Sequence, residues 1–506
     1  MNVYPQEPTP RPGRRFLLRG LLGTLLVAVL VGASVAAAVV LEVKDDIDIF
    51  SSNVQDIPSV QEVVDEVPPS DPQTILVLGS DKRYADGPKG QAHSDTMMLV
   101  RLDPDKAATT VMSVPRDLQI QLEGYGTEKL NASYFYGGPK LVVKTLKGIL
   151  GTQAHPFEIN HVVIVNFGGF QKLLTKMGCV YVDVDRHYFN DNNPPAGGGG
   201  DYATINVKAG YQKLCGNSGL DYVRYRHFDD DLVRAARQQD FLRQAKGQVE
   251  PGKLWSDRKE LLKLFAKNTQ TDIKGEDEIL PLLGLVVKSV TNPVQQVQFP
   301  VDEGPSYVTL QQDKLRSTVR RFLDPAVSKA NPTTVQEPTT TTSKKPKAKK
   351  KPKPATSSLA AGLTLNEDAG MEEGLPLANE VRFPVFYPTA IENGSQYVTG
   401  DRRAYNLRDQ KGRKYQAYRI VVKTGLVGQY YGIQGTSWKT PPILDNPTGE
   451  TKIDGRTFKL FGDGKRLQLV SWKTSKGVYW VSNTLLSKLT NKQMLGIAAS
   501  TKRFGQ

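Results

Sequence analysis

Cysteine and histidine are scarce in this chain, which has 2 cysteines and 5 histidines among 506 residues. Metal binding by two cysteines alone is unusual, because structural zinc sites take four ligands from cysteine and histidine. The histidines also lack the spacing of metal ligands. The composition therefore argues against a metal site made of these two residue types and gives no histidine a catalytic role. The histidines considered are His155, His161, His187 and His227.

Long apolar runs are also scarce, and the clearest one is residues 20–41, which carries no charge. As a helix, its 22 residues would rise about 33 Å, enough for a hydrocarbon core of ~30 Å. Four arginines precede it within residues 1–19 and four acidic residues follow within residues 42–48, so we expect a cytoplasmic tail (1–19), a transmembrane helix (20–41) and an extracytoplasmic remainder. A cleaved signal peptide is the alternative, but the run exceeds the usual 7–15 apolar residues.

The net charge of +14 indicates an anionic partner, although seven lysines of the excess crowd residues 344–353. A chain outside the cytoplasm is not expected to meet chromosomal DNA. We therefore predict no nucleic-acid partner and expect anionic lipids, lipid-linked phosphates or wall polymers instead. In that oxidising compartment a disulfide between Cys179 and Cys215 is the default expectation.

Composition divides the extracytoplasmic part into four segments. Residues 42–71 are polar and read as a membrane-proximal spacer, residues 72–325 as the main folded domain, residues 326–358 as a Thr-rich and then Lys/Pro-rich linker, and residues 359–506 as a second domain. The glycine-rich residues 191–200 read as a flexible loop over a site.

The main domain alternates short apolar runs with helical patterns, which predicts an α/β fold with a layered mixed β-sheet flanked by helices. Expected strands are residues 74–79, 96–102, 109–114, 161–165, 180–184 and 294–300, and expected helices are residues 137–150, 167–177, 254–265, 278–290 and 310–322.

The second domain is predicted to be small, antiparallel and β-rich, with strands at 415–423, 456–461, 467–473 and 478–483 and a helix at 491–499. Its aromatic residues at 430–438, with Trp472 and Trp480, would form either a core, which we favour, or a surface that stacks on glycans.

The most informative stretch is residues 221–244. Residues 222–226 alternate in a β-prone run, so Tyr222, Arg224 and Arg226 would leave one face of a strand. Asp229, Asp230 or Asp231 would cap the following helix, which puts Arg234 and Gln238 on one face. Such crowded arginines suit a phosphate ligand, because forked guanidinium donors match phosphate oxygens. The alternative is a solvated basic helix beside a strand that is salt-bridged to the three aspartates.

Two carboxylates flank a loop in the same domain. Asp81 follows the first predicted strand and Asp95 precedes the next one. Oxygen ligands of this kind hold Mg²⁺ with the help of substrate phosphates. Arg116 follows Pro115 at the exit of a third strand and completes the set.

Seven motifs in this order resemble the LytR-CpsA-Psr family over about residues 72–325. They are residues 79–83 (GSDKR), 94–97 (SDTM), 113–117 (SVPRD), 129–133 (KLNAS), 137–138 (GG), 222–226 (YVRYR) and 231–239 (DLVRAARQQ).

The resemblance implies a membrane-anchored phosphotransferase that moves a glycopolymer from a polyprenyl-pyrophosphate carrier to peptidoglycan, with a phosphodiester as product. It implies that Asp81 and Asp95 bind Mg²⁺, or Mn²⁺ in its place, and that Asp231 belongs to the catalytic arginine network. The residues that it assigns to the pyrophosphate are Arg83, Arg116, Arg224, Arg226, Arg234 and Gln238. The sequence departs from the family at His93, where many members carry arginine.

Two other functions fit the same residues. The chain could be a non-catalytic adaptor that binds phosphorylated wall polymer, or a hydrolase of the pyrophosphate lipid. The extra domain fits an actinobacterial type of the family.

Overall fold

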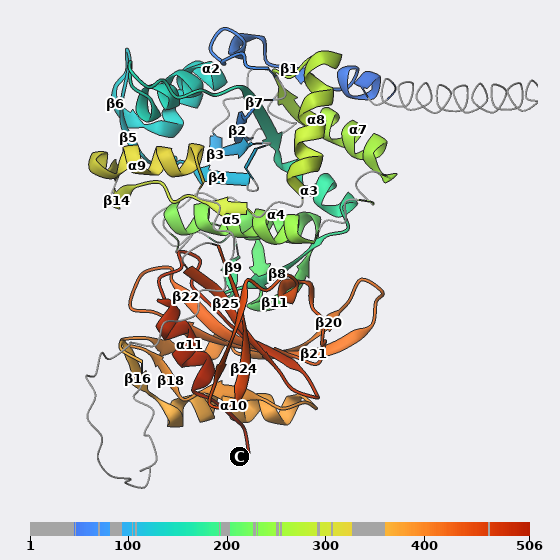
Figure 1. Cartoon of the computed structure of the whole chain (residues 1–506), viewed down its shortest axis with the longest axis vertical. Helices are drawn as coiled ribbons and strands as arrows, with labels where there is room; N and C mark the ends of the chain where they lie inside the picture. Colours follow the sequence, from blue (N-terminus) through green and yellow to red (C-terminus); the bar gives the residue numbers. More distant parts are fainter. Residues whose placement is uncertain are drawn as a thin grey trace, which may run out of the picture.

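The computed structural model describes residues 45–325 and 360–505, apart from residues 46, 69–70, 81–93, 104, 107–108, 192, 194–202, 226–228, 230, 249–251, 253–255, 291–293, 305–306 and 464–465. These residues form two lobes stacked along the long axis, which we call the α/β lobe (45–325) and the β lobe (360–505) (Figure 1). The predicted transmembrane helix, linker and glycine-rich loop lie outside the described residues or mostly so. No helix of the described part is long and apolar enough to cross a membrane.

The α/β lobe is built on a mixed seven-stranded sheet of order β1-β12-β7-β2-β3-β4-β13. Strand β3 is antiparallel to β2 and β4, whereas β7 is parallel to β2, and β13 is parallel to β4. Strands β2, β4, β7 and β13 therefore end at one edge of the sheet. The strands are β1 (Gln55–Asp56), β2 (Gln73–Ser80), β3 (Ser94–Leu102), β4 (Thr109–Ser113), β7 (His161–Asn166), β12 (Thr269–Thr271) and β13 (Val294–Gln296).

Side chains alternate across this sheet, and both faces are covered. Leu76 and Leu78 of β2 belong to the main core beneath α2 (Leu130–Leu150) and α9 (Gln312–Leu323). Ile75 points the other way and packs with Leu282 and Leu285 of α8 (Glu276–Val290). The predicted layered α/β fold with a mixed sheet is confirmed.

Two boundaries differ from the prediction. Helix α2 begins at Leu130 instead of residue 137, because the glycines there mark a kink inside the helix, where Gly138 has φ 60° and ψ −158°. The expected spacer at 42–71 is also wrong for its described part. Ile47, Phe50 and Val60 are buried, since the segment packs against the sheet and its helices and adds β1 to the sheet edge.

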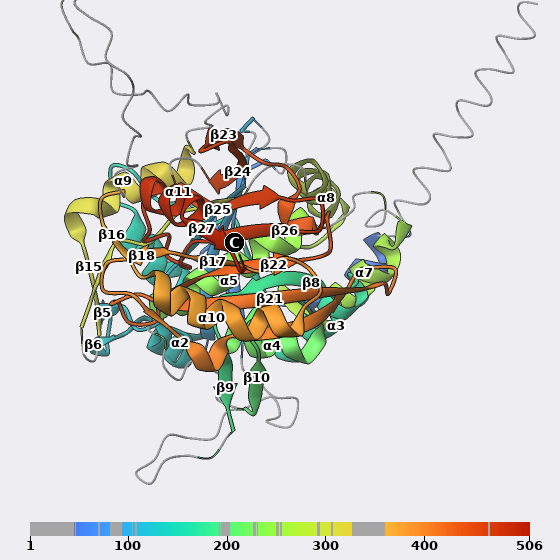
Figure 2. The ribbon, with the colours of Figure 1, turned by 90° about the horizontal axis from the view of Figure 1, so that it is seen from below.

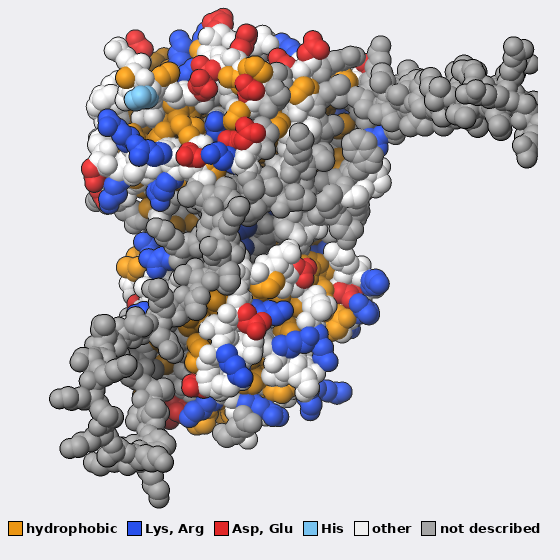
Figure 3. All heavy atoms as spheres, viewed as in Figure 1, with side chains coloured by type: hydrophobic (Ala, Val, Ile, Leu, Met, Phe, Trp, Pro, Cys, Tyr) orange, Lys and Arg blue, Asp and Glu red, His pale blue; other side chains and the backbone are white. Residues whose placement is uncertain are grey.

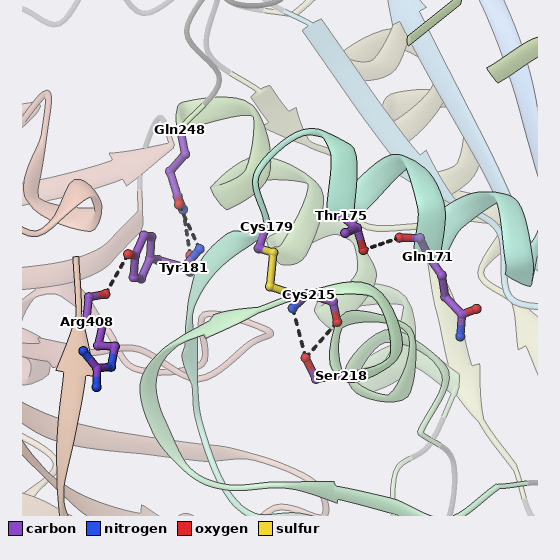
Figure 4. Close-up of a disulfide and its surroundings, with 8 residues drawn as sticks. All are labelled: Gln171, Thr175, Cys179, Tyr181, Cys215, Ser218, Gln248 and Arg408. Atoms are coloured by element: carbon purple, nitrogen blue, oxygen red, sulfur yellow. Dashed lines mark hydrogen bonds between the residues drawn. A yellow bond between two sulfur atoms is a disulfide. The ribbon is translucent and has the colours of Figure 1, made fainter. Parts of the chain in front are cut away.

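A smaller layer joins the α/β lobe to the β lobe. It contains α3 (Phe167–Lys176), β8 (Val180–Val184), β9 (Tyr188–Asn190), β10 (Ile205–Val207), β11 (Gly210–Leu214) and α4 (Gly216–Arg224). Cys179 and Cys215 form a disulfide between the start of β8 and the N-terminus of α4, with their Cα atoms 4.6 Å apart (Figure 4). Tyr181 of β8 donates from its hydroxyl to the carbonyl of Arg408 in the β lobe, at 2.7 Å.

The β lobe holds a sheet of order β19-β21-β22-β26-β25-β24-β23, with β20 beside β21, and every described pair is antiparallel. Helices α10 (Glu367–Glu380) and α11 (Asn491–Ala499) cover one face, and α10 lies on the side away from the α/β lobe (Figures 1 and 2). The strands are β19 (Gln396–Tyr397), β20 (Arg403–Arg408), β21 (Lys414–Lys423), β22 (Tyr430–Thr436), β23 (Gly449–Ile453), β24 (Arg456–Asp463), β25 (Arg466–Lys473) and β26 (Val478–Ser482).

The remaining elements are helices α5 and α7, together with short strands and 3-10 turns. They are η1 (Pro58–Val60), β5 (Gln119–Leu122), β6 (Gly126–Lys129), α5 (Asp231–Gly247), α7 (Arg258–Asn268), β14 (Val301–Glu303), β15 (Val308–Leu310), β16 (Leu363–Leu365), β17 (Phe386–Pro388), β18 (Ala390–Glu392), η3 (Thr399–Asp401), η4 (Pro442–Leu444) and β27 (Thr501–Arg503).

The second face of the β-lobe sheet is covered by the α/β lobe. Trp438 and Trp480 pack there against Tyr181 of β8 and Tyr211 of β11. Trp480 is 0% exposed, and Trp472, on the opposite face, is 3% exposed. The glycan-stacking alternative for these tryptophans is therefore wrong, and part of the predicted core is an interface between the lobes.

A buried ion pair lies at the centre of this interface. Arg419 of β21 donates from Nη1 to both carboxylate oxygens of Asp183 on β8, at 3.0 and 3.2 Å. Trp480 donates from Nε1 to the same carboxylate at 3.0 Å. A buried charge requires this kind of pairing, because desolvation of an unpaired ion is costly.

Replacing Arg419 tests how far the two lobes depend on this pair. Arg419→Ala is expected to lower the free energy of unfolding by roughly 3 to 5 kcal/mol, since it leaves the Asp183 carboxylate buried without its cation. Denaturant unfolding measures the change. Lys423→Ala is the matched control, because Lys423 is an exposed cation at the end of the same strand and its removal should leave stability nearly unchanged. Equal stability of the two variants would contradict the expectation.

Candidate active site

Several chain segments meet at the edge where β2, β4 and β7 end, which we call the site edge. Ser80, the last residue of β2, pairs with Ser94 of β3 and with Asn166 at the end of β7. The segments after β2, β4 and β7 and before β3 therefore begin or end side by side. In open α/β sheets, ligands bind at the carboxyl ends of strands.

Asp231, the first residue of α5, accepts hydrogen bonds from two arginines at the site edge. Its Oδ2 accepts the backbone N–H of Arg116 at 2.9 Å, and its Oδ1 lies 3.6 Å from Nε of Arg116. The same Oδ1 accepts from Nη2 of Arg234, one turn along the helix. One carboxylate thus holds two of the predicted phosphate-binding arginines together, although they lie 118 positions apart.

Gln238 ties the helix to two further segments. Its Nε2 donates to Oγ1 of Thr96 at 3.0 Å and to the carbonyl of Val223 at 3.1 Å. Thr96 follows Asp95 in β3, and Val223 precedes Arg224. Gln239 similarly donates to Oγ of Ser113, the last residue of β4, at 2.9 Å. Helix α5 therefore lies across the ends of two neighbouring strands.

The predicted strand at 222–226 is wrong, because Tyr222 and Arg224 lie in α4. Tyr222 is fully buried, whereas Arg224 ends the helix and pairs with Asp221 one turn back, at 2.7 Å. The guanidinium carbon of Arg224 is 5.9 Å from the centre of the Phe167 ring, and Phe167 directly follows β7. Arg224 therefore reaches the site edge from a helix end. The expected helix at 231–244, in contrast, is present as α5.

Every described arginine of the predicted set has a carboxylate partner. Arg116 and Arg234 contact Asp231, and Arg224 contacts Asp221. The alternative of arginines salt-bridged to Asp229, Asp230 and Asp231 thus holds for Arg234 but not for Arg224, whose partner is Asp221. It is wrong as to solvation, because the Arg234 and Asp231 side chains are only 6% and 7% exposed.

The structure describes the two predicted metal ligands only in part. Asp81, Arg83, His93 and Arg226 lie outside the described residues, and Asp95 is described only by its backbone in β3. No group of three or more His, Cys, Asp or Glu in the described part could hold a metal ion. The pairing of Ser80 with Ser94 fits the expected pair of carboxylates, since Asp81 and Asp95 are the residues that follow them in the sequence.

A second network of paired acids and arginines lies next to the Asp231 contacts and was not predicted. The Asp229 carboxylate is 0% exposed and pairs with both Arg186 and Arg237. Arg237 also donates to the carbonyl of Tyr225. The sequence signalled part of it, since Arg237 follows Arg234 by one turn, but nothing in the sequence linked Arg186 to this helix.

Comparison with known proteins decides the family. The LytR_cpsA_psr family model matches residues 44–322, which is more than half of the chain. The chain belongs to the LytR_cpsA_psr family. The resemblance drawn from the seven motifs is confirmed. The family region ends near α9, so the β lobe lies outside it.

Curated relatives match a smaller part. Regulatory protein MsrR of Staphylococcus aureus is 32% identical over 177 residues, which is 35% of this chain and 49% of the relative. The polyisoprenyl-teichoic acid–peptidoglycan teichoic acid transferases TagU of Oceanobacillus iheyensis and TagT of Bacillus subtilis are 31% identical over 211 residues and 30% identical over 187 residues. Those matches cover 40% and 36% of this chain, and 59% and 55% of the relatives. The chain spans about half the length of the curated relatives it matches.

Solved structures also align with part of the chain. A protein of Streptococcus agalactiae aligns with a TM-score of 0.43 and 24% identity, over 53% of this chain and 90% of that one. The B. subtilis family protein YwtF (TagT) with bound octaprenyl pyrophosphate lipid aligns with a TM-score of 0.36 and 23% identity, over 52% and 93%.

Asp185 is a buried carboxyl beside the second network. Tyr188 donates from its hydroxyl to Oδ1 of Asp185 at 2.6 Å. Burial raises the pKa of Asp185 to about 6, against the opposing effect of the Arg186 charge and the Tyr188 hydrogen bond. Asp229 raises this pKa further and Arg237 lowers it, so all the charged groups that face Asp185 belong to the network.

The raised pKa predicts a pH-dependent stability. The folded chain keeps the Asp185 proton up to about pH 6, whereas the unfolded chain loses it near pH 4, so this contribution to stability is present below about pH 4 and is lost as pH rises through about 6. Asp185→Asn stays neutral. Its stability relative to wild type is expected to rise by roughly 2 to 3 kcal/mol between pH 4 and pH 7, measured by denaturant unfolding.

The control for this measurement is Asp191→Asn, because Asp191 is exposed. Its stability relative to wild type should not change over the same pH range. A constant difference between Asp185→Asn and wild type from pH 4 to pH 7 would contradict the shifted pKa.

Proposed function

We propose that this chain is a membrane-anchored extracytoplasmic phosphotransferase that moves a glycopolymer from a polyprenyl-pyrophosphate carrier to peptidoglycan. The single observation that carries the proposal is the network at the site edge, where Asp231 joins Arg116 to Arg234 at the end of strand β4. Family membership supports the reaction type, since relatives named TagT and TagU are teichoic acid transferases by name.

The reaction needs charge stabilisation more than it needs a nucleophilic residue. An acceptor hydroxyl of peptidoglycan attacks the phosphorus that carries the glycan, the bond to the bridging oxygen breaks, and polyprenyl phosphate leaves as the hydroxyl proton is released. Such phosphoryl transfers depend mainly on positioning and on electrostatic stabilisation of the spreading negative charge. Arg116 and Arg234 would bind the pyrophosphate oxygens, and Asp231 would keep the two guanidinium groups in register.

A divalent cation fits the remaining donors. Asp81 and Asp95 would hold Mg²⁺, or Mn²⁺ in its place, which would neutralise phosphate charge as the carrier leaves. The oxygen-only character of this pair suits a hard cation. Arg224 and Arg226 would complete the phosphate contacts. Gln238, predicted as a further phosphate ligand, instead fixes the start of β3, because its Nε2 already donates to Thr96 and to the carbonyl of Val223.

The location of the chain remains part of the proposal. Residues 20–41 would anchor it in the cytoplasmic membrane with the two lobes outside. The face of the β lobe in Figure 3 displays more lysine and arginine than acidic side chains, which suits an anionic wall polymer nearby.

Removal of the Arg116 guanidinium tests the transferase proposal. The assay contains full-length protein, a polyprenyl-pyrophosphate glycan donor, Mg²⁺ and peptidoglycan oligomers. Arg116→Ala is expected to form product at least ~100-fold more slowly than wild type, because a cation that stabilises the transition-state charge is lost. Glycan attached to peptidoglycan is quantified by mass spectrometry. Arg320→Ala on α9, whose side chain is exposed, is the matched control and should retain full activity.

Three outcomes of this assay would overturn the proposal. Undiminished product from Arg116→Ala would show that the network has no catalytic part. Donor that is retained by wild type without any product would identify an adaptor. Free phosphorylated glycan as the main product, with acceptor present, would identify a hydrolase.

Metal removal tests the cation separately. Chelation by EDTA is expected to stop product formation, and Mg²⁺ or Mn²⁺ is expected to restore it, because the pyrophosphate charge is otherwise uncompensated. Asp95→Asn should require a higher metal concentration for half-maximal rate, whereas the exposed Asp313→Asn should not. Full activity in the presence of chelator would contradict a role for the metal.

A further inference from the structure

The guanidinium group of Arg186 lies where the two lobes meet. Arg186 follows β8, and its side chain is only 7% exposed. Three tyrosine rings surround its guanidinium carbon, with centres 4.4 Å (Tyr188), 5.2 Å (Tyr225) and 5.1 Å (Tyr430) away. Tyr188 and Tyr225 belong to the α/β lobe, whereas Tyr430 is the first residue of β22 in the β lobe. Cation–π contacts of this kind strengthen when the cation is desolvated.

This arginine is connected to the start of α5 through Asp229. The Asp229 carboxylate accepts from Arg186 with one oxygen and from Arg237 of α5 with the other. Asp229 stands two positions before Asp231, and Arg237 stands one turn after Arg234. The position of Arg186 therefore affects the part of α5 where Asp231 contacts both Arg234 and Arg116.

The β lobe also contacts this segment directly. Gly428 has φ +66°, and a Cβ atom built there would lie 3.1 Å from a methyl group of Val233 and 3.6 Å from the Asp229 carboxylate. On the other side of Arg186, the backbone N–H of His187 donates to Oδ2 of Asp401 at 2.8 Å. Figure 1 shows α5 at the boundary between the lobes, next to the strands of the β lobe.

We propose that the β lobe positions the active site, with Tyr430 as the residue that does so through Arg186 and Asp229. Tyr430 holds the Arg186 guanidinium against Asp229. Asp229 in turn holds Arg237 in the second turn of α5, so Asp231 and Arg234 keep the positions that phosphate binding needs. Tyr430 is a positioning residue, since nothing places it on the substrate. The inference rests on the transferase function proposed above and assigns the extra lobe a part in it.

The test compares Tyr430→Ala with Tyr430→Phe in the full-length protein. The Phe variant keeps the aromatic face over Arg186, whereas the Ala variant removes it. We expect Tyr430→Ala to lower kcat by roughly ten- to a hundred-fold, because displacements of about 1 Å in an active site have effects of that order. Tyr430→Phe is expected to stay within about two-fold of wild type.

Hydrogen exchange at the backbone amides of residues 231–238 is the second measurement, and it does not depend on turnover. Exchange there should become faster in Tyr430→Ala and should be unchanged in Tyr430→Phe. Tyr415→Ala is the matched control. Tyr415 is a half-buried tyrosine of the same sheet that stacks on Trp438, and no described contact joins it to Arg186.

The outcomes separate the two proposals. Absence of product with wild type would overturn the transferase function, and faster exchange in Tyr430→Ala would then still establish the coupling between the lobes. Turnover and exchange of Tyr430→Ala equal to those of Tyr430→Phe would overturn the positioning role. Equal losses in Tyr430→Ala and Tyr415→Ala would also overturn it, since both variants would then act through general destabilisation.

Discussion

The structure depends on the pairing of buried arginines with buried carboxylates around the first turns of α5. A guanidinium group taken out of water is stable only when an acid and hydrogen-bond acceptors compensate its desolvation. Asp229 serves Arg186 and Arg237, and Asp231 serves Arg116 and Arg234. These pairs join β4, the segment after β8 and α5, which are distant in sequence. The pairing therefore fixes both the packing of α5 on the sheet and the place where phosphate would bind.

The second constraint is that the β-lobe sheet has two apolar faces. Helices α10 and α11 cover one, and the other would expose Trp480 and Trp438 if the α/β lobe were removed. A large exposed apolar patch is unfavourable in water. The pair of Asp183 with Arg419 adds a specific polar contact, because each buried charge is compensated only when β8 and β21 bring the two side chains together. The β lobe is thus a structural continuation of the family fold.

The sequence predicts what local patterns determine and misses what contacts between distant residues determine. Strands β2, β3 and β4 follow from short apolar runs, and α5 follows from residues 231–244 lacking Gly and Pro. The strand predicted at 222–226 fails because residues 222–224 form the last turn of α4, where Tyr222 is buried and Arg224 ends the helix. Helix α10 contains Gly370 and Gly374, which argue against a helix locally. A Cβ at Gly370 would lie 2.2 Å from the carbonyl oxygen of Pro388, so close packing requires glycine there.

The sequence predicted which residues belong to the candidate site. It did not predict how their positive and negative charges pair. Motif spacing selected Arg116, Asp231 and Arg234, but only the fold shows that Asp117 and Lys129 join them, with Asp117 Oδ1 3.0 Å from Nζ of Lys129. Three cations then share two carboxylates in this cluster. The excess positive charge would draw the anion of the proposed reaction to the site edge, while the carboxylates keep the arginines in place. A site that is ordered in advance loses less entropy on binding, so in the proposed phosphate site the acids would matter as much as the arginines do.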